Sequence, residues 1–225
     1  MKELLKNVLK RTPFFWLVYS LHYRIFHYFL MPRWERLGRP IPPPYPFKQA
    51  MLRECAKKYG LKIFVETGTC HGDTVSALLH DFEKIYSIEL CEEYYRLVVK
   101  RFKRMPKVTL ILGDSAIQMP TVLRQIKTIN RPVLFWLDGH YSGADSAKGE
   151  VATPIFQELA HILSESQTWN SVIAIDDARE FGTNPDYPSL EALTAFVRSK
   201  RSDIKVMTNM DVIWILPLTS LDQTS

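Results

Sequence analysis

Carboxylates stand at the ends of three successive apolar runs of the sequence, directly or after one glycine. Glu66, Glu89 and Asp114 each follow a run of the length of a buried strand. A carboxylate at a strand end can accept hydrogen bonds from both hydroxyls of a ribose, accept one from an exocyclic amine, or attract a cationic group. For Asp114 a second interpretation stays open, because Asp is a favoured helix N-cap. Three such positions in succession predict a ligand site at one edge of a sheet.

A loop with two glycines follows the first of these runs, in the order Glu66-Thr67-Gly68-Thr69-Cys70-His71-Gly72. Glycine permits tight turning and a close approach of the backbone to a ligand. The spacing differs from the dinucleotide motif G-x-G-x-x-G, and the sequence has no Gly-Lys-Ser/Thr of a phosphate-binding loop. Glu66 would repel a phosphate and attract a cationic ligand. The alternative is an ordinary turn in which the glycines serve geometry alone.

Short apolar runs alternate with helical stretches from residue 47 onward. The predicted strands cover 63–65, 85–88, 108–112, 133–137, 172–175, 204–207 and 212–216. The predicted helices cover 47–59, 73–80, 91–104, 115–128, 153–166 and 188–199. This alternation predicts an α/β fold, with a mostly parallel sheet covered by helices on both faces. The last two runs are too close together for a crossover helix, so we expect them to pair as an antiparallel hairpin.

Residues 61–216 resemble a class I S-adenosylmethionine-dependent methyltransferase. The loop over 66–72 is similar to that family's E/D-x-G-x-x-x-G motif, Glu89 matches the acid that binds the ribose, and Asp114-Ser115 match the pair that reads the adenine. The resemblance implies a Rossmann-like sheet of seven strands in the order 3-2-1-4-5-7-6 with a reversed final strand. It also implies S-adenosylmethionine as cofactor, contacted by Glu66, Thr67, Gly68, Thr69, His71, Gly72, Glu89, Asp114, Ser115 and Asp138.

A second group of carboxylates follows the fourth and fifth predicted strands, which are neighbours in that order. Asp138, Asp176 and Asp177 would converge there, and Mg²⁺ would offset their mutual repulsion. The arrangement resembles metal-dependent O-methyltransferases of the catechol and macrolide-sugar types, in which such residues hold magnesium. The metal lowers the pKa of the acceptor hydroxyl. The alternative is that Asp176 or Asp177 caps a helix or pairs with Arg179.

Catalytic roles are expected for Asp138 and for His140, two residues further along. Imidazole titrates near neutral pH, so His140 is a candidate general base. The polar loops over 141–153 and 180–188 are expected to set the choice of substrate. The basic stretch over 100–104 is expected to be a solvated helix face.

Composition fits a globular protein and divides its charge unevenly. Of the 225 residues, 46% are hydrophobic and 24% charged, which excludes a mainly disordered chain. Residues 1–60 carry 12 Lys and Arg against 3 Asp and Glu, whereas the remainder carries 17 against 21. The body is therefore mildly acidic, and we expect no nucleic-acid partner. Three cysteines without a CxxC spacing predict neither a zinc site nor a disulfide framework, and favour a cytoplasmic protein.

The N-terminal part, residues 1–46, is expected to be a basic aromatic helical extension with a proline-rich linker, followed by the main domain over 47–225. Aromatic residues over 14–30 are mixed with Arg24, His22 and His27. This mixture suits packing on protein, including a second subunit, or contact of residues 1–31 with a membrane surface. A membrane span is disfavoured by the central arginine. Five prolines within 40–46 predict an extended segment.

Together these patterns predict a magnesium-assisted O-methyltransferase that acts on a hydroxyl of a small molecule or saccharide. It would lie in the cytoplasm or at the inner face of the membrane. Two alternatives stay open. One is a metal-dependent hydroxylase of the same fold, disfavoured because no clear set of two His and one carboxylate is present. The other is a non-catalytic module that docks to a membrane or a partner.

Overall fold

The computed structural model describes residues 25, 29–139, 153–165 and 170–218, and contains one seven-stranded sheet in the order β3-β2-β1-β4-β5-β7-β6. The order and the strand positions confirm the sequence prediction. The strands are β1 (Ile63–Thr67), β2 (Lys84–Glu89), β3 (Val108–Leu112), β4 (Val133–Leu137), β5 (Val172–Ile175), β6 (Ile204–Asn209) and β7 (Val212–Pro217). The helices are α3 (Tyr45–Tyr59), α4 (Asp73–Leu78), α5 (Glu92–Phe102), α6 (Ser115–Ile129), α7 (Ile155–Ser164), η2 (Ala178–Glu180) and α8 (Leu190–Lys200).

The reversed strand β7 closes the sheet next to β5. The strands β3, β2, β1, β4 and β5 pair in parallel, whereas β7 is antiparallel to both β5 and β6. The β6–β7 turn places Met210 and Asp211 at positive φ. Ile175 at the end of β5 pairs with Ile213 near the start of β7, so this turn lies at the edge where the parallel strands end. Asp211 is thereby brought to the edge that carries the predicted site.

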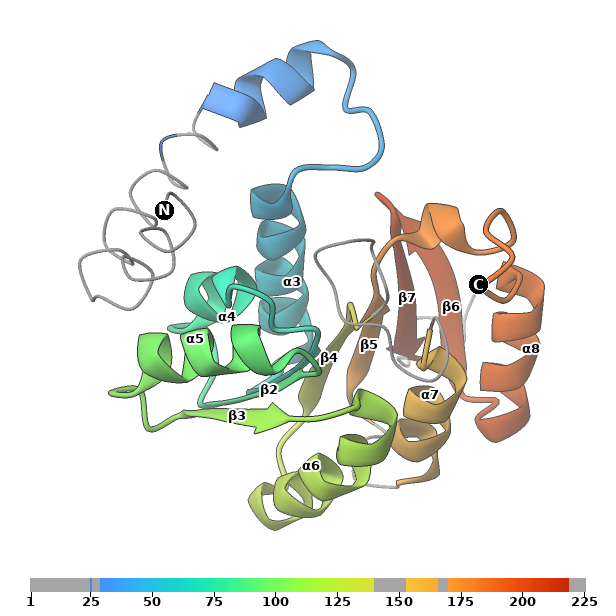
Figure 1. The fold of residues 1–225 in the computed structure, drawn as a ribbon. Helices are drawn as coiled ribbons and strands as arrows, with labels where there is room; N and C mark the ends of the chain where they lie inside the picture. The colour runs from blue at the N-terminus through green and yellow to red at the C-terminus, as the bar shows by residue number, and fades with distance from the viewer. Residues whose placement is uncertain (1–24, 26–28, 140–152, 166–169, 219–225) are drawn as a thin grey trace.

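Helices cover both faces of the sheet, as Figure 1 shows. On one face, Phe64 packs in a buried cluster with residues of α3, α4 and α5. On the other, Ile63 and Val65 pack with residues of α6, α7 and α8. Alternate residues of β1 thus enter opposite cores, which is why the strand reads as a continuous apolar run. These two cores fix the strand ends from which the site is built.

Helix α3 begins earlier than the sequence suggested. Its first residue is Tyr45, and Pro46 lies in its first turn instead of in an extended linker. Proline is tolerated there because the first N–H groups of a helix have no intrahelical partner. The residues spaced by four, Lys48, Leu52 and Ala56, are all buried against the domain. Lysine therefore occupies a position on the buried face of this helix.

A helical segment over 29–36 precedes α3 and stands away from the body of the domain (Figure 1). Trp34 anchors it, because its ring lies 4.7 Å from that of Phe47 and its Nε1 donates to the carbonyl of Pro40 at 2.8 Å. Among the helices that the structure describes, none is both long and apolar enough to cross a bilayer. The predictions for residues 1–24 fall outside the described part of the chain.

Candidate functional site

The ends of β1 and β4 approach each other closely at Gly68. A Cβ atom on Gly68 would lie 2.6 Å from the carbonyl oxygen of Asp138, and its φ is +83°. Thr67 joins the same two ends, because its Oγ1 accepts from the backbone N–H groups of Asp138 and Gly139, each at 3.2 Å. The glycine is therefore required by the approach of the two strand ends as well as by the turn.

Glu66 is buried at the end of β1 and faces β2. Its Oε2 accepts a hydrogen bond from Ser87 Oγ at 2.6 Å, and Thr69 Oγ1 lies 2.6 Å from the same hydroxyl. Burial raises the pKa of Glu66 to about 8, and the nearby Glu89 adds to this, while the hydrogen bond from Ser87 opposes it. A cationic ligand beside Glu66 would restore the charged form.

Glu89 joins the loops that follow β1 and β2. Its two carboxylate oxygens accept from the backbone N–H groups of Cys70 and Cys91, each at 2.7 Å. Burial raises the pKa of Glu89, and these backbone hydrogen bonds work in the opposite direction. The carboxylate is thereby held in a fixed orientation, in which its oxygens can also accept a hydrogen bond from a ribose hydroxyl.

Asp114 and Ser115 lie where β3 leads into α6. Asp114 is the N-cap of that helix, since its Oδ1 accepts from the N–H of Ala116 at 2.8 Å. Ser115 is buried and lies beside Gly139 of the β4 end, because a Cβ there would be 3.5 Å from its Oγ. The capping interpretation of Asp114 is thus correct, and its role toward an adenine stays a prediction.

The glycine loop is tied to α5 by an arginine. Arg101 Nη1 donates to the backbone oxygen of His71 and to Asp73 Oδ1, the latter at 2.8 Å. The side chain of Arg101 is 8% exposed, so the expectation of a solvated helix face over 100–104 was wrong for this residue. His71 itself contacts Cys70 Sγ through Nδ1 at 3.2 Å and packs edge-on against Tyr94.

Three carboxylates gather at the end of β5 and the start of β7, and we call Asp176, Asp177 and Asp211 the acidic cluster. Among the described residues they form a group in which the oxygens lie within 4.8 Å of one another. Asp138 is not a member of that group, although its charge acts on both Asp176 and Asp177. Burial, followed by the charges of Asp176 and Asp177, raises the pKa of Asp138 well above its ordinary value.

Two basic side chains already contact the acidic cluster. Lys48 Nζ is hydrogen-bonded to Asp176 Oδ1 and lies 3.4 Å from Asp177 Oδ1 and 4.0 Å from Asp211 Oδ2. Arg179 Nη1 donates to Asp177 Oδ1 at 2.8 Å and also to Asp211 Oδ2. Burial would lower the pKa of Lys48, but Asp176 and Asp177 together raise it, so its ammonium is charged. The pairing of Asp177 with Arg179, which was the alternative to a metal-binding role, is therefore observed.

Aromatic hydroxyls and a pocket complete this side of the site. The charge of Asp138, and then burial, raise the pKa of Tyr45, whereas burial is the main cause for Tyr187. Both phenols are therefore protonated donors at neutral pH. A pocket opens beside Asp176, lined by Leu137, Gly139, Thr153, Pro154, Ile155, Glu158, Ile175, Asp176, Phe181 and Tyr187.

Comparison with known proteins adds solved structures of the same architecture. The methyltransferase PaMTH1 of Podospora anserina, bound to S-adenosylhomocysteine, has 17% identity and a TM-score of 0.52 over 84% of this chain and 88% of its own. The O-methyltransferase TomG of Streptomyces achromogenes, in complex with S-adenosylmethionine, has 16% identity and a TM-score of 0.54 over 83% and 86%. The chain has the fold of class I methyltransferases. No family model and no curated protein matches the sequence.

In this methyltransferase fold, the structure places the predicted residues at one edge of the sheet. Glu66 leads into the loop after β1, and Glu89 is hydrogen-bonded to that loop at Cys70. Gly68 lies within the loop and brings it against Asp138. Asp176 and Asp177 follow β5, the neighbour of β4. His140 and most of the 141–153 loop lie outside the described residues, so the general-base prediction for His140 stays a prediction.

The magnesium prediction can be compared with the side chains in place. Carboxylate oxygens are the right donors for Mg²⁺. However, Lys48 Nζ already lies among the oxygens of the acidic cluster, in contact with Asp176. With Lys48 in this position, a divalent ion does not fit among the three carboxylates of the acidic cluster, and the predicted set of Asp138, Asp176 and Asp177 stays a prediction.

Sequence reasoning missed Lys48, Asp211 and Tyr45. Lys48 had a visible signal, because its spacing of four from Leu52 and of eight from Ala56 places it on the buried stripe of α3. Asp211 had no such signal in the sequence. Aspartate is common in hairpin turns because it tolerates their backbone conformations, so its presence there does not indicate a site. Tyr45 was assigned to the linker and not to the helix that brings it to the site.

Proposed function

We propose that this chain is an S-adenosylmethionine-dependent methyltransferase that transfers a methyl group to a hydroxyl of a small molecule or saccharide. The fold supports this proposal, since both solved structures reported above share it and have S-adenosylmethionine or its product bound. The residues at the strand ends support it further, because the carboxylate of Glu66 suits a cationic group and that of Glu89 suits the hydroxyls of a ribose.

One observation carries the proposal, namely the contact between the loop after β1 and the end of β4. Gly68 brings the loop that would hold the donor against Asp138, and Asp138 is electrostatically linked to Asp176 and Asp177. The donor site and the carboxylates of the acceptor side are therefore adjacent. Methyl transfer needs this adjacency, because the acceptor oxygen, the methyl carbon and the sulfur must be aligned.

The reaction forms an oxygen–carbon bond and breaks the sulfur–carbon bond of the sulfonium, which leaves as the thioether S-adenosylhomocysteine. The proton of the acceptor hydroxyl passes to a base. Asp138 and His140 are the candidates for that base. Tyr187 lines the pocket beside Asp176, and the phenol of Tyr45 interacts with the charges of the same carboxylates. Phenols and carboxylates can form hydrogen bonds with hydroxyl groups, which supports an acceptor that carries them.

Magnesium assistance is the finer part of the prediction. The acidic cluster offers suitable oxygens, and Lys48 is its competitor for the same place. We therefore route no step of the proposed reaction through a metal. A contact of residues 1–31 with a membrane, assembly into a homo-oligomer and a cytoplasmic location remain predictions from the sequence.

Titration calorimetry with S-adenosylhomocysteine tests the donor site. We expect micromolar binding to the wild-type chain and at least about tenfold weaker binding to Glu89→Gln. In that variant an amide N–H₂ would face a backbone N–H, either of Cys70 or of Cys91, and the carboxylate for the ribose would be lost. Transfer of a labelled methyl group from S-adenosylmethionine to a panel of polyhydroxyl acceptors then tests the reaction.

The matched control is Glu93→Gln, which makes the same change at an exposed position in the first turn of α5. It should bind S-adenosylhomocysteine as the wild type does. A folded wild-type chain without measurable binding would contradict the proposal and favour the non-catalytic module.

A further inference from the structure

Lys48 is a charged side chain that is buried at the site but comes from a distant part of the sequence. It is 5% exposed and comes from α3, whereas Asp176, its hydrogen-bonded partner, is 1% exposed and lies 128 residues later. Burial of an unpaired ammonium is costly, so a lysine is kept in such a position only by partners of opposite charge. The acidic cluster supplies these partners from two strand ends.

The position of Lys48 is set by its helix and not by the cluster alone. Leu52 and Ala56, one and two turns further along α3, are buried in the core on the same face. The ring of Tyr45 also lies near the ammonium, with Nζ 5.7 Å from its centroid. To move Nζ away from Asp176, the Lys48 side chain would have to adopt another rotamer among packed neighbours. The alternative is a displacement of the first turn of α3.

Two basic groups, Lys48 and Arg179, pair with the three carboxylates of the acidic cluster and offset part of their charge. Asp176 contacts Lys48, Asp211 contacts Arg179, and Asp177 lies within 3.4 Å of a cationic nitrogen of each. Arg179 holds the side that faces the β6–β7 turn, and Lys48 holds the side that faces α3. A divalent ion among the same oxygens would lie beside an ammonium that the fold cannot readily withdraw, and like charges at this separation repel strongly.

We propose that the ammonium of Lys48 is the resident cation of the acidic cluster and takes the place of a divalent metal. Lys48 acts as a positioning residue, because it holds Asp176 and Asp177 in place beside the acceptor pocket. That these carboxylates face an acceptor rests on the proposed methyltransferase function. The occupation of the cluster by Lys48 rests on the geometry alone. Methyl transfer by this chain is then independent of added Mg²⁺.

The test is the binding of Mn²⁺ alone, followed by the electron paramagnetic resonance signal of the free ion. The wild-type chain should leave that signal unchanged. Lys48→Ala should bind the ion at least about tenfold more tightly than the wild type, because it exposes buried carboxylates without their cation. The melting temperature of Lys48→Ala should rise on addition of Mn²⁺, and that of the wild type should not. Lys57→Ala, on the exposed side of the same helix, is the matched control and should behave as the wild type.

Two results would overturn the proposal. One is Mn²⁺ binding by the wild-type chain that Asp176→Asn abolishes, and the other is a folded Lys48→Ala variant that gains no binding. If Lys48→Ala fails to fold, Lys48→Gln keeps the stem and a hydrogen-bond donor without the charge, and the same gain is expected from it. Mn²⁺ binding by the wild-type chain that depends on Asp176 decides against the proposal whether or not a Lys48 variant folds.

Titration of the same samples with S-adenosylhomocysteine separates this proposal from the proposed function. Donor binding without Mn²⁺ binding supports both. Absence of donor binding contradicts the methyltransferase function, and the Mn²⁺ result for Lys48→Ala still decides which cation the cluster holds. Once an acceptor is found, transfer in excess EDTA should equal transfer in Mg²⁺.

Discussion

The Glu66 carboxylate is hydrogen-bonded and almost completely buried in the folded chain. Burial raises its pKa to about 8, whereas an unfolded glutamate titrates near its ordinary value. Between the two values the folded chain binds a proton that the unfolded chain releases. The stability that this proton contributes is complete at acidic pH and is lost as the pH rises toward 8.

We therefore predict that the free energy of unfolding falls more steeply between pH 5 and 8 in the wild type than in Glu66→Gln. The difference should reach a few kcal/mol at most, since about one pKa unit corresponds to 1.4 kcal/mol. Urea denaturation at several pH values measures it. Asp176, whose pKa is also raised, titrates in both proteins and cancels in the comparison. Parallel curves for the two proteins would contradict the prediction.

The same carboxylate should make donor binding depend on pH. A cationic group beside Glu66 favours its charged form, so binding expels the proton and tightens as the pH rises toward 8. We predict this trend for S-adenosylmethionine with the wild type, and a flatter curve for Glu66→Gln. Calorimetry in buffers of different ionisation enthalpy would also detect the released proton. Equal pH dependence in both proteins would show that Glu66 does not face the cation.

Gly68 permits a close approach between two strand ends, and its replacement should be costly for that reason. In Gly68→Ala the new methyl group would lie 2.6 Å from the carbonyl oxygen of Asp138, in addition to the strain of a positive φ. We predict a loss of at least about 2 kcal/mol of stability and of donor binding. Gly60→Ala is the matched control, since φ is +64° there but nothing lies within 4 Å of the added Cβ. It should lose about 1 kcal/mol and keep donor binding.

At the scale of the elements, the fold was predictable because the central strands are buried on both faces. Runs such as Val133–Leu137 are apolar throughout, as a covered parallel strand requires. The exposed edge strand β6 was predicted to end at residue 207 but ends at Asn209, because exposed polar residues give no hydrophobic signal. Pro46 was misassigned because its place in the first turn depends on where α3 begins.

The site was predictable only where a residue follows its own strand directly. Glu89 and Asp176 could be located in this way, since the strand end fixes their position. The contact of Lys48 with Asp176 could not be found, because it joins α3 to β5 across 128 residues. Burial of Lys48 was visible in the helical period, but the identity of its partner depends on the tertiary fold. Asp211 reaches the site only because β7 is reversed.

Helix α5 supports the loop after β1, and this support should affect donor binding. Arg101 bonds both the backbone oxygen of His71 and the side chain of Asp73. We predict that Arg101→Ala weakens S-adenosylhomocysteine binding about tenfold and speeds hydrogen exchange over residues 68–73. Arg104→Ala, which changes an exposed arginine just after α5, should alter neither. Unchanged exchange in Arg101→Ala would show that the loop is held without this helix.

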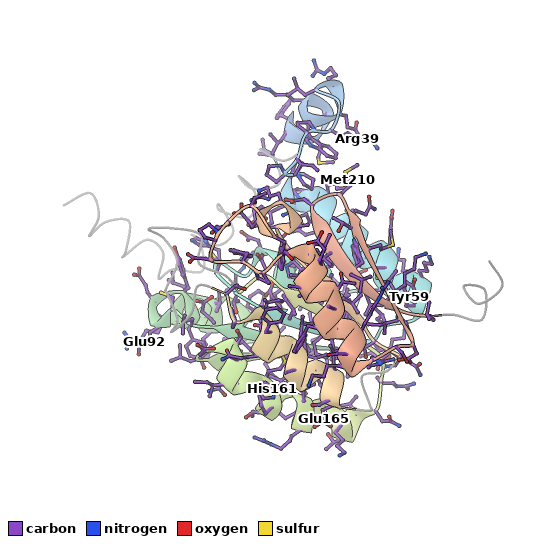
Figure 2. All side chains as sticks on the ribbon, turned by 90° about the vertical axis from the view of Figure 1, so that its right-hand side faces the viewer. Arg39, Tyr59, Glu92, His161, Glu165 and Met210 are labelled. Atoms are coloured by element: carbon purple, nitrogen blue, oxygen red, sulfur yellow. The ribbon has the colours of Figure 1, made fainter. Side chains whose placement is uncertain are left out.

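At the scale of the whole molecule, the described N-terminal residues 29–41 lie at the same end as the site. Figure 2 shows Arg39 at one end, Met210 of the β6–β7 turn toward that end, and His161 and Glu165 at the opposite one. The β6–β7 turn also carries Asp211 of the acidic cluster. A surface bound by residues 29–41 would therefore lie at the end of the molecule that carries the acidic cluster, and the proposed methyltransferase would then act on an acceptor presented at that surface.

Apolar and basic side chains share this segment. Phe29, Leu37 and Ile41 are 69%, 65% and 58% exposed, and Arg33 and Arg36 are exposed among them. This combination suits a membrane surface with anionic lipids, which attracts each nearby basic residue by about 1 kcal/mol. We predict that the full chain cosediments with vesicles containing phosphatidylglycerol and not with pure phosphatidylcholine. Arg33→Glu/Arg36→Glu should weaken this binding by at least about tenfold.

The control for charge alone is Lys57→Glu/Lys58→Glu, which makes the same change at the far end of α3 and should leave vesicle binding unchanged. High salt should weaken the binding of the wild type, since exposed charges are screened. Equal weakening by both double variants would mean that net charge, and not the N-terminal segment, determines binding. Absence of binding together with a dimer in sedimentation analysis would instead show that the exposed apolar residues pack against a second copy of the chain.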